Sequence, residues 1–272
     1  MTILWVFLPP KGARFYLCPL SLYWSGMAKR RLDVLLVERG LAETRMRAQA
    51  LVLAGLVWSE GRRLEKPGTM LAQDAPLELM GRDHPWVSRG GVKLAHALQH
   101  FAIGVAGAVA LDIGASTGGF TDVLLTEGAQ RVYAVDVGHG QLAWKLRRDP
   151  RVVVLERRNA RYLTRAEIPE PPDLIVCDAS FIGLETVLPA ALALVAPRAR
   201  LVALIKPQFE VGKGNVGKGG VVRDPALHRE VCARIAAWLE ARDWHVDGIT
   251  ESPIHGPEGN VEFLISARRL PP

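Results

Sequence analysis

The sequence predicts an α/β fold in which a mainly parallel, seven-stranded sheet carries helices on both faces, preceded by a small α+β domain. From about residue 109 onward, short apolar runs alternate with helical stretches, and this alternation is typical of parallel sheets. Between residues 31 and 80 the order differs, because two amphipathic helical segments come first and strand-like residues around a glycine turn follow. The change of pattern predicts two domains, at residues 28–85 and 86–272.

Residues 1–27 mix Trp, Tyr, Pro and Cys without a helical or strand period. Met27 then opens an amphipathic pattern at once, in the letters MAKRRLDVLLVERG. We expect translation to start at Met27, so that the preceding residues are an extension, and the alternative is a genuine but poorly ordered tail. The opening apolar stretch has no basic flank and is cut short by Pro9 and Pro10, so it does not resemble a signal peptide.

The small domain is expected to begin with two helices. The first should present an apolar side made by Leu32, Leu35, Leu36 and Val37. Gly40 suits the end of that helix, and Thr44 can cap a second helix that stops near Gly55. The apolar positions of the second helix are Ala48, Leu51, Val52 and Leu53.

The large domain is expected to hold seven strands, at residues 109–113, 131–136, 152–156, 173–178, 200–206, 245–250 and 261–267. Helical stretches lie between them, and the clearest cover residues 184–195 and 225–242. In open sheets of this kind, ligands bind beyond the carboxyl ends of the strands. Polar residues at those ends are therefore the first candidates for a site.

Composition and charge exclude several classes of protein. The net charge of +6 permits a polyanionic partner, and nine Lys/Arg against five Asp/Glu lie between residues 29 and 66. A solvated helix face is the simpler explanation of that cluster, and nucleic-acid contact is the more specific one. The three cysteines lie far apart, which argues against a disulfide framework or a zinc site and fits a cytoplasmic protein without a bound metal. No apolar run reaches the roughly 18 residues of a membrane-spanning helix.

A glycine-rich turn follows the first strand of the large domain, in the letters ALDIGASTGGFTD. Gly114 would let the chain turn sharply, and Gly118 and Gly119 would keep side chains away from a ligand lying on the turn. The spacing differs from the Gly-x-Gly-x-x-Gly of pyrophosphate sites, and no Gly-Lys-Ser/Thr follows, so a nucleoside without phosphates is favoured. The alternative is a strand-to-helix turn without a special role.

Asp136 comes 22 residues after Gly114, at the end of the second strand, where a carboxylate can accept both ribose hydroxyls of a nucleoside. Turn and carboxylate together resemble motifs I and II of class I methyltransferases, and the resemblance implies a Rossmann-like domain that binds S-adenosylmethionine. Asn159 would then lie near the adenine, although a surface turn residue is almost as good an interpretation. The residues expected at the cofactor are Asp112, Gly114, Ser116, Thr117, Gly118, Gly119, Asp136, Val137 and Asn159.

The class of methyl acceptor leaves traces after the fourth strand. Enzymes that methylate amino groups usually carry Asn/Asp-Pro-Pro-Tyr there, whereas this chain reads CDASF. Pyrimidine C5 enzymes need a nucleophilic cysteine, and Cys177 lies within an apolar strand, as a buried thiol would. Both acceptor classes are therefore disfavoured.

Four ionisable residues stand where a reaction centre is expected: Lys93, Asp178, Lys206 and Glu262. Asp178 and Lys206 end apolar strands, where they would reach the ligand edge of the sheet, although a strand-terminal charge is often only a solvated end. Burial and neighbouring charges would lower the pKa of Lys206 and help it act as a base. The set resembles the Lys-Asp-Lys-Glu tetrad of FtsJ-type ribose 2′-O-methyltransferases. This resemblance implies that Lys206 deprotonates or orients the hydroxyl and that the other three residues tune and position it.

Residues 31–71 resemble the S-four-type RNA-binding domain, although Ser59, Glu60 and Gly61 stand where that family usually has Val-Asn-Gly. Phosphate contacts of such a domain supply affinity without reading bases. The candidates in this domain are Lys29, Arg30, Arg31, Arg45, Arg47, Arg62, Arg63 and Lys66. Lys213 and Lys218, in the glycine-rich stretch after Lys206, are expected to close over RNA, and the alternative is a flexible loop without a role.

Both domains together, with VSRGGVKL, AVDVGHGQL, CDASFI, IKPQFE and GNVEFL, resemble the TlyA family, often labelled hemolysin A, over residues 28–268. The resemblance implies 2′-O-methylation of cytidines in ribosomal RNA, with ribosomal subunits as partners and neither a membrane nor an obligate protein partner. Two alternatives are kept. A membrane-active hemolysin would need a lytic or spanning segment that the sequence does not offer. A non-catalytic RNA-binding protein is disfavoured because the tetrad and the glycine-rich turn are complete.

Overall fold

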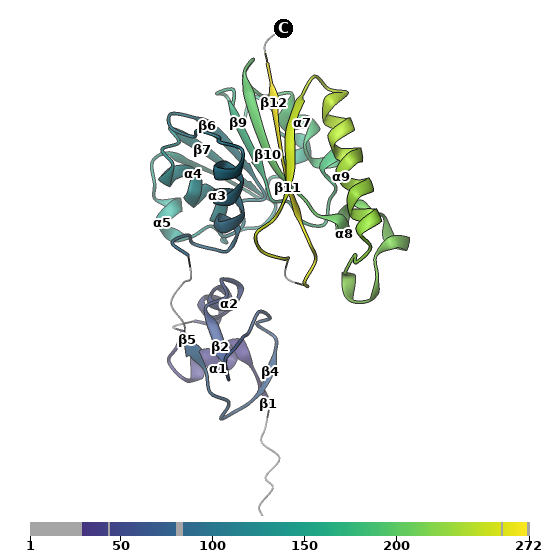
Figure 1. Ribbon diagram of the computed structural model, residues 1–272. Coiled ribbons are helices and arrows are strands. Elements are labelled where there is room, and N and C mark those ends of the chain that lie inside the picture. Colours follow the sequence, from purple (N-terminus) through teal and green to yellow (C-terminus); the bar gives the residue numbers. More distant parts are fainter. Residues whose placement is uncertain (1–28, 43, 80–83, 257, 271–272) are drawn as a thin grey trace, which may run out of the picture.

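The computed structural model describes residues 29–42, 44–79, 84–256 and 258–270, and the expectations about residues 1–27 lie outside them. The large domain is built on one seven-stranded sheet, in the order β11-β12-β10-β9-β6-β7-β8 (Figure 1). All neighbouring pairs from β10 to β8 are parallel, and β12 runs antiparallel to both β10 and β11. The predicted seven-stranded, mainly parallel sheet is confirmed.

The strands of this sheet are β6 (Val109–Ile113), β7 (Arg131–Asp136), β8 (Val152–Glu156), β9 (Leu174–Cys177), β10 (Ala199–Ile205), β11 (His245–Glu251) and β12 (Phe263–Arg269). The α-helices are α3 (Gly90–His100), α4 (Gly119–Thr126), α5 (Trp144–Arg147), α6 (Leu184–Val187), α7 (Pro189–Leu192), α8 (Pro207–Glu210) and α9 (Pro225–Glu240). Short 3-10 turns are η1 (Ala160–Tyr162), η2 (Lys213–Asn215) and η3 (Lys218–Gly220). The helical stretch predicted over residues 184–195 ends earlier, at Leu192, and is not one continuous helix. Two short helices replace it, because Pro189 has no N–H for a continuous helix ladder.

Apolar side chains cover both faces of the sheet. Leu111 and Ile113 of β6 belong to a cluster that includes residues of α6, α7 and α9. Ala110, which directly precedes Leu111 in β6, belongs to a second cluster that includes residues of α3 and α4. Successive residues of a strand point to opposite faces, so each face is buried by its own set of helices, as the sequence predicted (Figure 1).

The small domain consists of β1 (Lys29–Arg31), α1 (Leu32–Glu38), α2 (Arg45–Leu53), β2 (Val57–Ser59), β3 (Arg62–Arg63), β4 (Met70–Ala72) and β5 (Glu78–Leu79). Thr44 caps α2 as predicted, because its hydroxyl accepts a hydrogen bond from the N–H of Arg47 at 3.1 Å. Gly40 and Gly55 both take a positive φ just after a helix, as predicted. Leu53 is an exception, since its side chain is exposed and not buried on the apolar side of α2.

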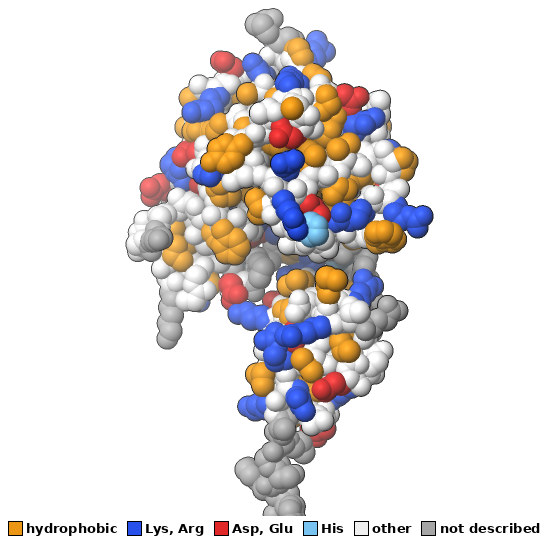
Figure 2. All heavy atoms as spheres, turned by 180° about the vertical axis from the view of Figure 1, so that it is seen from behind, with side chains coloured by type: hydrophobic (Ala, Val, Ile, Leu, Met, Phe, Trp, Pro, Cys, Tyr) orange, Lys and Arg blue, Asp and Glu red, His pale blue; other side chains and the backbone are white. Residues whose placement is uncertain are grey.

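Asp33 organises the charges of the small domain. Its carboxylate is fully buried and accepts hydrogen bonds from Arg31 at 3.0 Å, from Arg45 at 2.9 Å and from Gln49 at 2.9 Å. These bonds, that of Arg31 foremost, outweigh burial and hold the pKa of Asp33 well below its ordinary value. The charged carboxylate therefore holds two arginines in place. Figure 2 shows several Lys and Arg side chains on one face of this domain.

We expect Asp33→Asn to lower the melting temperature near neutral pH, because the lowered pKa means that the charged form stabilises the folded state. That contribution is present above the ordinary aspartate pKa of about 4 and is lost as the pH falls further. The gap between wild type and variant should therefore narrow in acid, as circular dichroism melts can measure. Asp74→Asn, at an exposed position of the same domain, is the control. Equal melting temperatures near neutral pH would contradict this role of Asp33.

Candidate active site

A pocket of about 550 Å³ opens at the carboxyl edge of the sheet, where β6, β9 and β10 end. Its wall contains the glycine-rich turn after β6 and all four ionisable residues predicted for the reaction centre. The volume lies within the range of small-molecule sites. The two sites predicted from separate motifs are therefore parts of one cavity.

The glycine-rich turn connects β6 to α4 and needs its glycines for packing. Gly114 and Gly118 take φ values of 81° and 95°. A Cβ at Gly114 would lie 3.0 Å from the carbonyl oxygen of Asp178, and one at Gly118 would lie 2.3 Å from the side chain of Leu146. A Cβ at Gly119 would lie 2.8 Å from a backbone nitrogen of α3. These contacts are between protein and protein, so packing alone already requires glycine at positions 118 and 119, and clearance for a ligand there stays a prediction.

Asp136 ends β7 beside this turn and holds it in place. Its Oδ2 accepts a hydrogen bond from the N–H of Ser116 at 2.8 Å, and its Oδ1 accepts one from the N–H of Gly138 at 2.6 Å. The Ser116 hydroxyl donates to the side-chain oxygen of Gln141 at 3.2 Å. Each carboxylate oxygen has a second lone pair, so Asp136 can hold the turn and still accept hydrogen bonds from a ligand.

Only some of the residues predicted at the cofactor form the pocket wall, namely Gly114, Ser116, Thr117 and Gly119. Asp112 lies fully buried beneath the turn and accepts a hydrogen bond from the Thr121 hydroxyl at 2.6 Å. Burial raises the pKa of Asp112 to about 7. Val137 is exposed outside the pocket, and Asn159 caps η1 by accepting from a backbone N–H. Asp112, Val137 and Asn159 do not belong to the pocket wall, and their expected place at the cofactor stays a prediction.

The four ionisable residues form two ion pairs. Lys206 Nζ lies 2.6 Å from Asp178 Oδ1, and Lys93 Nζ lies 2.6 Å from Glu262 Oε2. Lys93, Lys206 and Glu262 are buried, and Asp178 is nearly so. Two positive charges and two negative charges thus balance each other in a region of low dielectric. The structure brings together the whole set, from α3, from the ends of β9 and β10, and from the residue before β12.

Glu262 reaches this edge because β12 is antiparallel to β10. The pairing of the two strands runs from Ala199 opposite Arg269 to Ile205 opposite Phe263. Lys206 follows the last pair and Glu262 precedes it, so they occupy the next opposed positions of the same register. An antiparallel strand brings its amino end to the edge where parallel strands bring their carboxyl ends.

The pKa of Lys206 is raised, so the prediction that it is lowered was wrong. Burial is the largest single influence and lowers this pKa, but the carboxylates of Asp178 and Glu262 together outweigh it. The ammonium also donates a hydrogen bond to Ser180 Oγ at 2.8 Å. A general base must be neutral before it takes a proton, so the surroundings of Lys206 favour a held cation over a base.

The pocket wall includes residues that the sequence interpretation did not single out: Arg89, Ser180, Phe181, Gln208, Phe209 and Asn260. Phe181 is 90% exposed at a φ of 66°, and its ring lies 5.1 Å from that of Phe209. The buried Asn260 accepts from the N–H of Val222 and donates to the carbonyl of Gly220, both at 3.0 Å. It fastens the end of the glycine-rich stretch to the pocket. The one available signal for Phe181 was its place directly after Ser180 in CDASF.

The small domain meets the large one at the rim of this pocket. Leu53, at the end of α2, forms part of the pocket wall. Glu65 accepts a hydrogen bond from Arg89 at 3.3 Å, and Lys66 pairs with Glu258 at 3.1 Å. Arg89 and Glu258 are themselves wall residues. Contacts between the domains therefore lie next to the tetrad.

The residues predicted to contact RNA fall into two groups in the described part of the small domain. One group lies beside acidic side chains: Arg31, Arg45, Arg63 and Lys66. The other is exposed and makes no ion pair with a described residue: Lys29, Arg30, Arg47 and Arg62. The side chains of Lys213 and Lys218 are outside what the structure describes.

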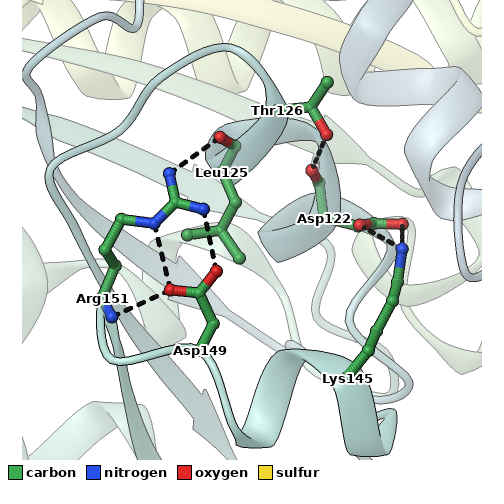
Figure 3. A network of polar contacts seen from close by, with 6 residues as sticks. All are labelled: Asp122, Leu125, Thr126, Lys145, Asp149 and Arg151. Carbon is green, nitrogen blue, oxygen red and sulfur yellow. Dashed lines mark hydrogen bonds and ion pairs between the residues drawn. The ribbon is translucent and has the colours of Figure 1, made fainter.

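A polar network behind the turn holds the start of the large domain (Figure 3). Asp122 of α4 accepts hydrogen bonds from the N–H of Val87 at 2.8 Å and from Lys145 of α5 at 2.8 and 3.0 Å. Arg151 pairs with Asp149 just before β8. The network ties α4 and α5 to the segment that leads into α3, the helix that carries Lys93.

The structure bears on two alternatives raised by the sequence, a pyrimidine C5 methyltransferase with a nucleophilic cysteine and a membrane-active hemolysin. Cys177 is fully buried in β9, and burial raises its pKa to about 12. A thiolate nucleophile is therefore not available at this position near neutral pH. No helix in the described part of the chain is long and apolar enough to cross a membrane.

Known proteins match both domains. The FtsJ-like methyltransferase family matches residues 86–269, and the S4 domain matches residues 30–75. A Mycobacterium tuberculosis protein named 16S/23S rRNA (cytidine-2′-O)-methyltransferase TlyA is 52% identical over 89% of this chain and 91% of its own. Bacillus subtilis YqxC, provisionally named an rRNA methyltransferase, is 50% identical over 87% of this chain and 85% of its own. A hemolysin-named structure from Streptococcus thermophilus is 44% identical, with a TM-score of 0.70 over 90% of each chain.

We expect Gly114→Ala to reduce the free energy of unfolding by about 1–3 kcal/mol more than Gly107→Ala does. Both glycines have a similar φ, 81° and 78°, so the backbone strain of the two substitutions is matched. Only at Gly114 would the new Cβ meet rigid backbone, that of Asp178 and Ala179, while Gly107 has open space. Urea unfolding of both variants measures the difference, and equal losses would show that the close approach to Asp178 does not constrain the turn.

Proposed function

The chain belongs to the FtsJ-like methyltransferase family, and from this membership we propose that it transfers a methyl group from S-adenosylmethionine to the ribose 2′-hydroxyl of cytidine in ribosomal RNA. The observation that carries the proposal is the ion pair of Lys206 with Asp178 in a pocket shared with the glycine-rich turn. Relatives that match both domains are named for this reaction or for rRNA methylation. The domains are taken as residues 28–85 and 86–272.

The pocket suits S-adenosylmethionine as the cofactor. Gly114, Ser116 and Thr117 give a wall of small side chains and backbone on which a nucleoside can lie. Asp136, fastened to Ser116, keeps lone pairs for ribose hydroxyls at the end of that wall. When bound, the cofactor supplies an electrophilic methyl group on a sulfonium.

The tetrad orients the acceptor and takes its proton. The Lys206 ammonium donates a hydrogen bond to the 2′-oxygen and aligns it with the methyl group. With S-adenosylmethionine bound, the carbon–oxygen bond would form as the sulfur–methyl bond breaks and leaves a neutral thioether, and the hydroxyl proton would pass to the carboxylate of Asp178, which lies next to the ammonium. The pair of Lys93 with Glu262 keeps the buried charges balanced while this proton moves. Lys206 thus orients the acceptor, and its raised pKa is consistent with this part of the role that the resemblance implied.

The small domain supplies affinity for the RNA. A ribose acceptor gives the chemical step little information on sequence, so target choice depends on contacts elsewhere. The exposed basic residues of this domain, Arg47 and Arg62 among them, suit phosphate contacts, and the domain lies at the pocket rim. Ribosomal RNA within ribosomal subunits is the proposed partner, and the cytoplasm is the proposed compartment.

Lys206→Ala tests the proposal. We expect it to lower kcat by about 100-fold or more while the affinity for S-adenosylmethionine stays within a few-fold, because the lysine acts on the acceptor. Asp136→Ala should show the opposite pattern, with cofactor binding weakened by about 1–3 kcal/mol. Tritiated methyl transfer to ribosomal subunits measures the first effect, and calorimetry measures the second. Undiminished transfer by the Lys206 variant would remove this lysine from the mechanism.

The pH dependence of kcat distinguishes two roles for Lys206, a lysine that stays protonated and a general base. The raised pKa keeps Lys206 protonated to a higher pH than an ordinary lysine, whose pKa is about 10.4. If the ammonium is the active form, kcat at saturating substrates should be level from neutral pH to about pH 9. If the neutral amine were the base, kcat would rise about tenfold for each pH unit over that range. A rise of this kind would overturn the assignment of the proton to Asp178.

A further inference from the structure

Gln208 lies two residues after Lys206, in α8, and its side chain belongs to the pocket wall. Its amide oxygen Oε1 is buried and has no hydrogen-bond partner among the described residues. A buried acceptor without a donor is costly, about 1–3 kcal/mol, and most buried polar atoms in folded proteins are paired. An unpaired acceptor in the wall of a binding pocket can accept a hydrogen bond from a bound ligand.

The charged residues two positions before and two positions after Gln208 already have partners. Lys206, two residues before it, is paired with Asp178 and donates to Ser180. Glu210, two residues after it, accepts from the N–H of Leu184 and from Arg234. Pairing Oε1 with Lys206 would break an existing bond of that lysine, whereas a bound ligand could donate to Oε1 without disturbing these pairs.

We propose that Gln208 Oε1 accepts a hydrogen bond from the exocyclic amine of the target cytosine, which makes Gln208 a specificity-determining residue. The inference rests on the proposed function. Cytosine presents an amine where uracil presents a carbonyl oxygen, and a carbonyl oxygen facing Oε1 would leave both acceptors unpaired. The aromatic pair of Phe181 and Phe209 lies in the same wall, and such rings provide flat surfaces on which a base can stack. Phe209 adjoins Gln208 in α8, so stacking and reading of the base would come from neighbouring residues.

Ribosomal subunits reconstituted with three different rRNAs test the inference. The target position carries cytidine, uridine or 2-pyrimidinone riboside, which is cytidine without the amine. We expect the wild type to lose about tenfold or more in kcat/KM when the amine is absent. Gln208→Met, which removes the acceptor at similar size, should lose a similar factor on cytidine and nothing further on 2-pyrimidinone. Gln99→Met, the same change at an exposed position of α3, should behave as the wild type.

Gln208→Glu provides a second variant, because its carboxylate keeps an acceptor and has no donor. It should retain the preference for cytidine over uridine even if the methionine variant fails to fold. Calorimetry with S-adenosylmethionine is run on each variant, since the cofactor also carries an amino group. If Gln208→Met keeps its cofactor affinity but no longer discriminates between cytidine and 2-pyrimidinone, the result supports recognition of the cytosine amine by Gln208.

The outcomes separate this inference from the proposed function. No transfer by the wild type to any of the three subunits would overturn both. Transfer by the wild type at equal rates to cytidine and 2-pyrimidinone would overturn the inference alone, and so would full discrimination by Gln208→Met. Weaker cofactor binding by Gln208→Met, with equal losses on all three substrates, would assign Oε1 to the amino group of the cofactor and also overturn the inference.

Discussion

Two lysines and two carboxylates lie buried together at the carboxyl edge of the sheet, and each charge is tolerated there only because the others are present. Removing one partner of a buried ion pair leaves an uncompensated charge at a cost of about 3–5 kcal/mol. The elements that carry Lys93, Asp178, Lys206 and Glu262 must therefore be held at fixed distances. Close packing at the glycine-rich turn fixes the residue after β9, and the network around Asp122 fixes the segment before α3. The proposed reaction centre therefore requires all four charges to be present together, whatever the role of each side chain.

The balance of charge also determines the protonation state of Lys206. In an apolar pocket a lysine would lose its proton easily, but the carboxylates beside Lys206 stabilise its charged form. In the proposed mechanism this cation orients the acceptor oxygen and stabilises the negative charge that develops there. The small domain follows a similar rule at Asp33, where one buried carboxylate fixes two arginines on the surface. In both domains, carboxylates fix the position of the cationic side chains beside them and stabilise their positive charge.

Much of the fold could be predicted from the sequence, because β6, β7 and β8 are short apolar runs bounded by turns. Asp178 and Lys206 could be placed from the rule that parallel strands end at one edge. Glu262 needed the family resemblance, since it precedes an antiparallel strand. The direction of the Lys206 pKa depended on distances to two carboxylates that are remote in sequence. The packing role of Gly118 and the unpaired oxygen of Gln208 also depend on distances between residues that are remote in sequence, so neither could be predicted from the sequence.

The register between β10 and β12 sets the position of Glu262 relative to Lys206. Seven opposed pairs lie between Ala199 and Ile205, and Glu262 sits one step beyond the last of them. Side chains alternate between faces, so one residue inserted anywhere in β12 would turn part of the strand over and detach its pattern from that of β10. An insertion close to Phe263 would therefore move Glu262 off its position opposite Lys206, whereas one close to Arg269 would leave the pairs next to the pocket unchanged. The number of residues in β12 next to the pocket is thus constrained as well as their chemistry.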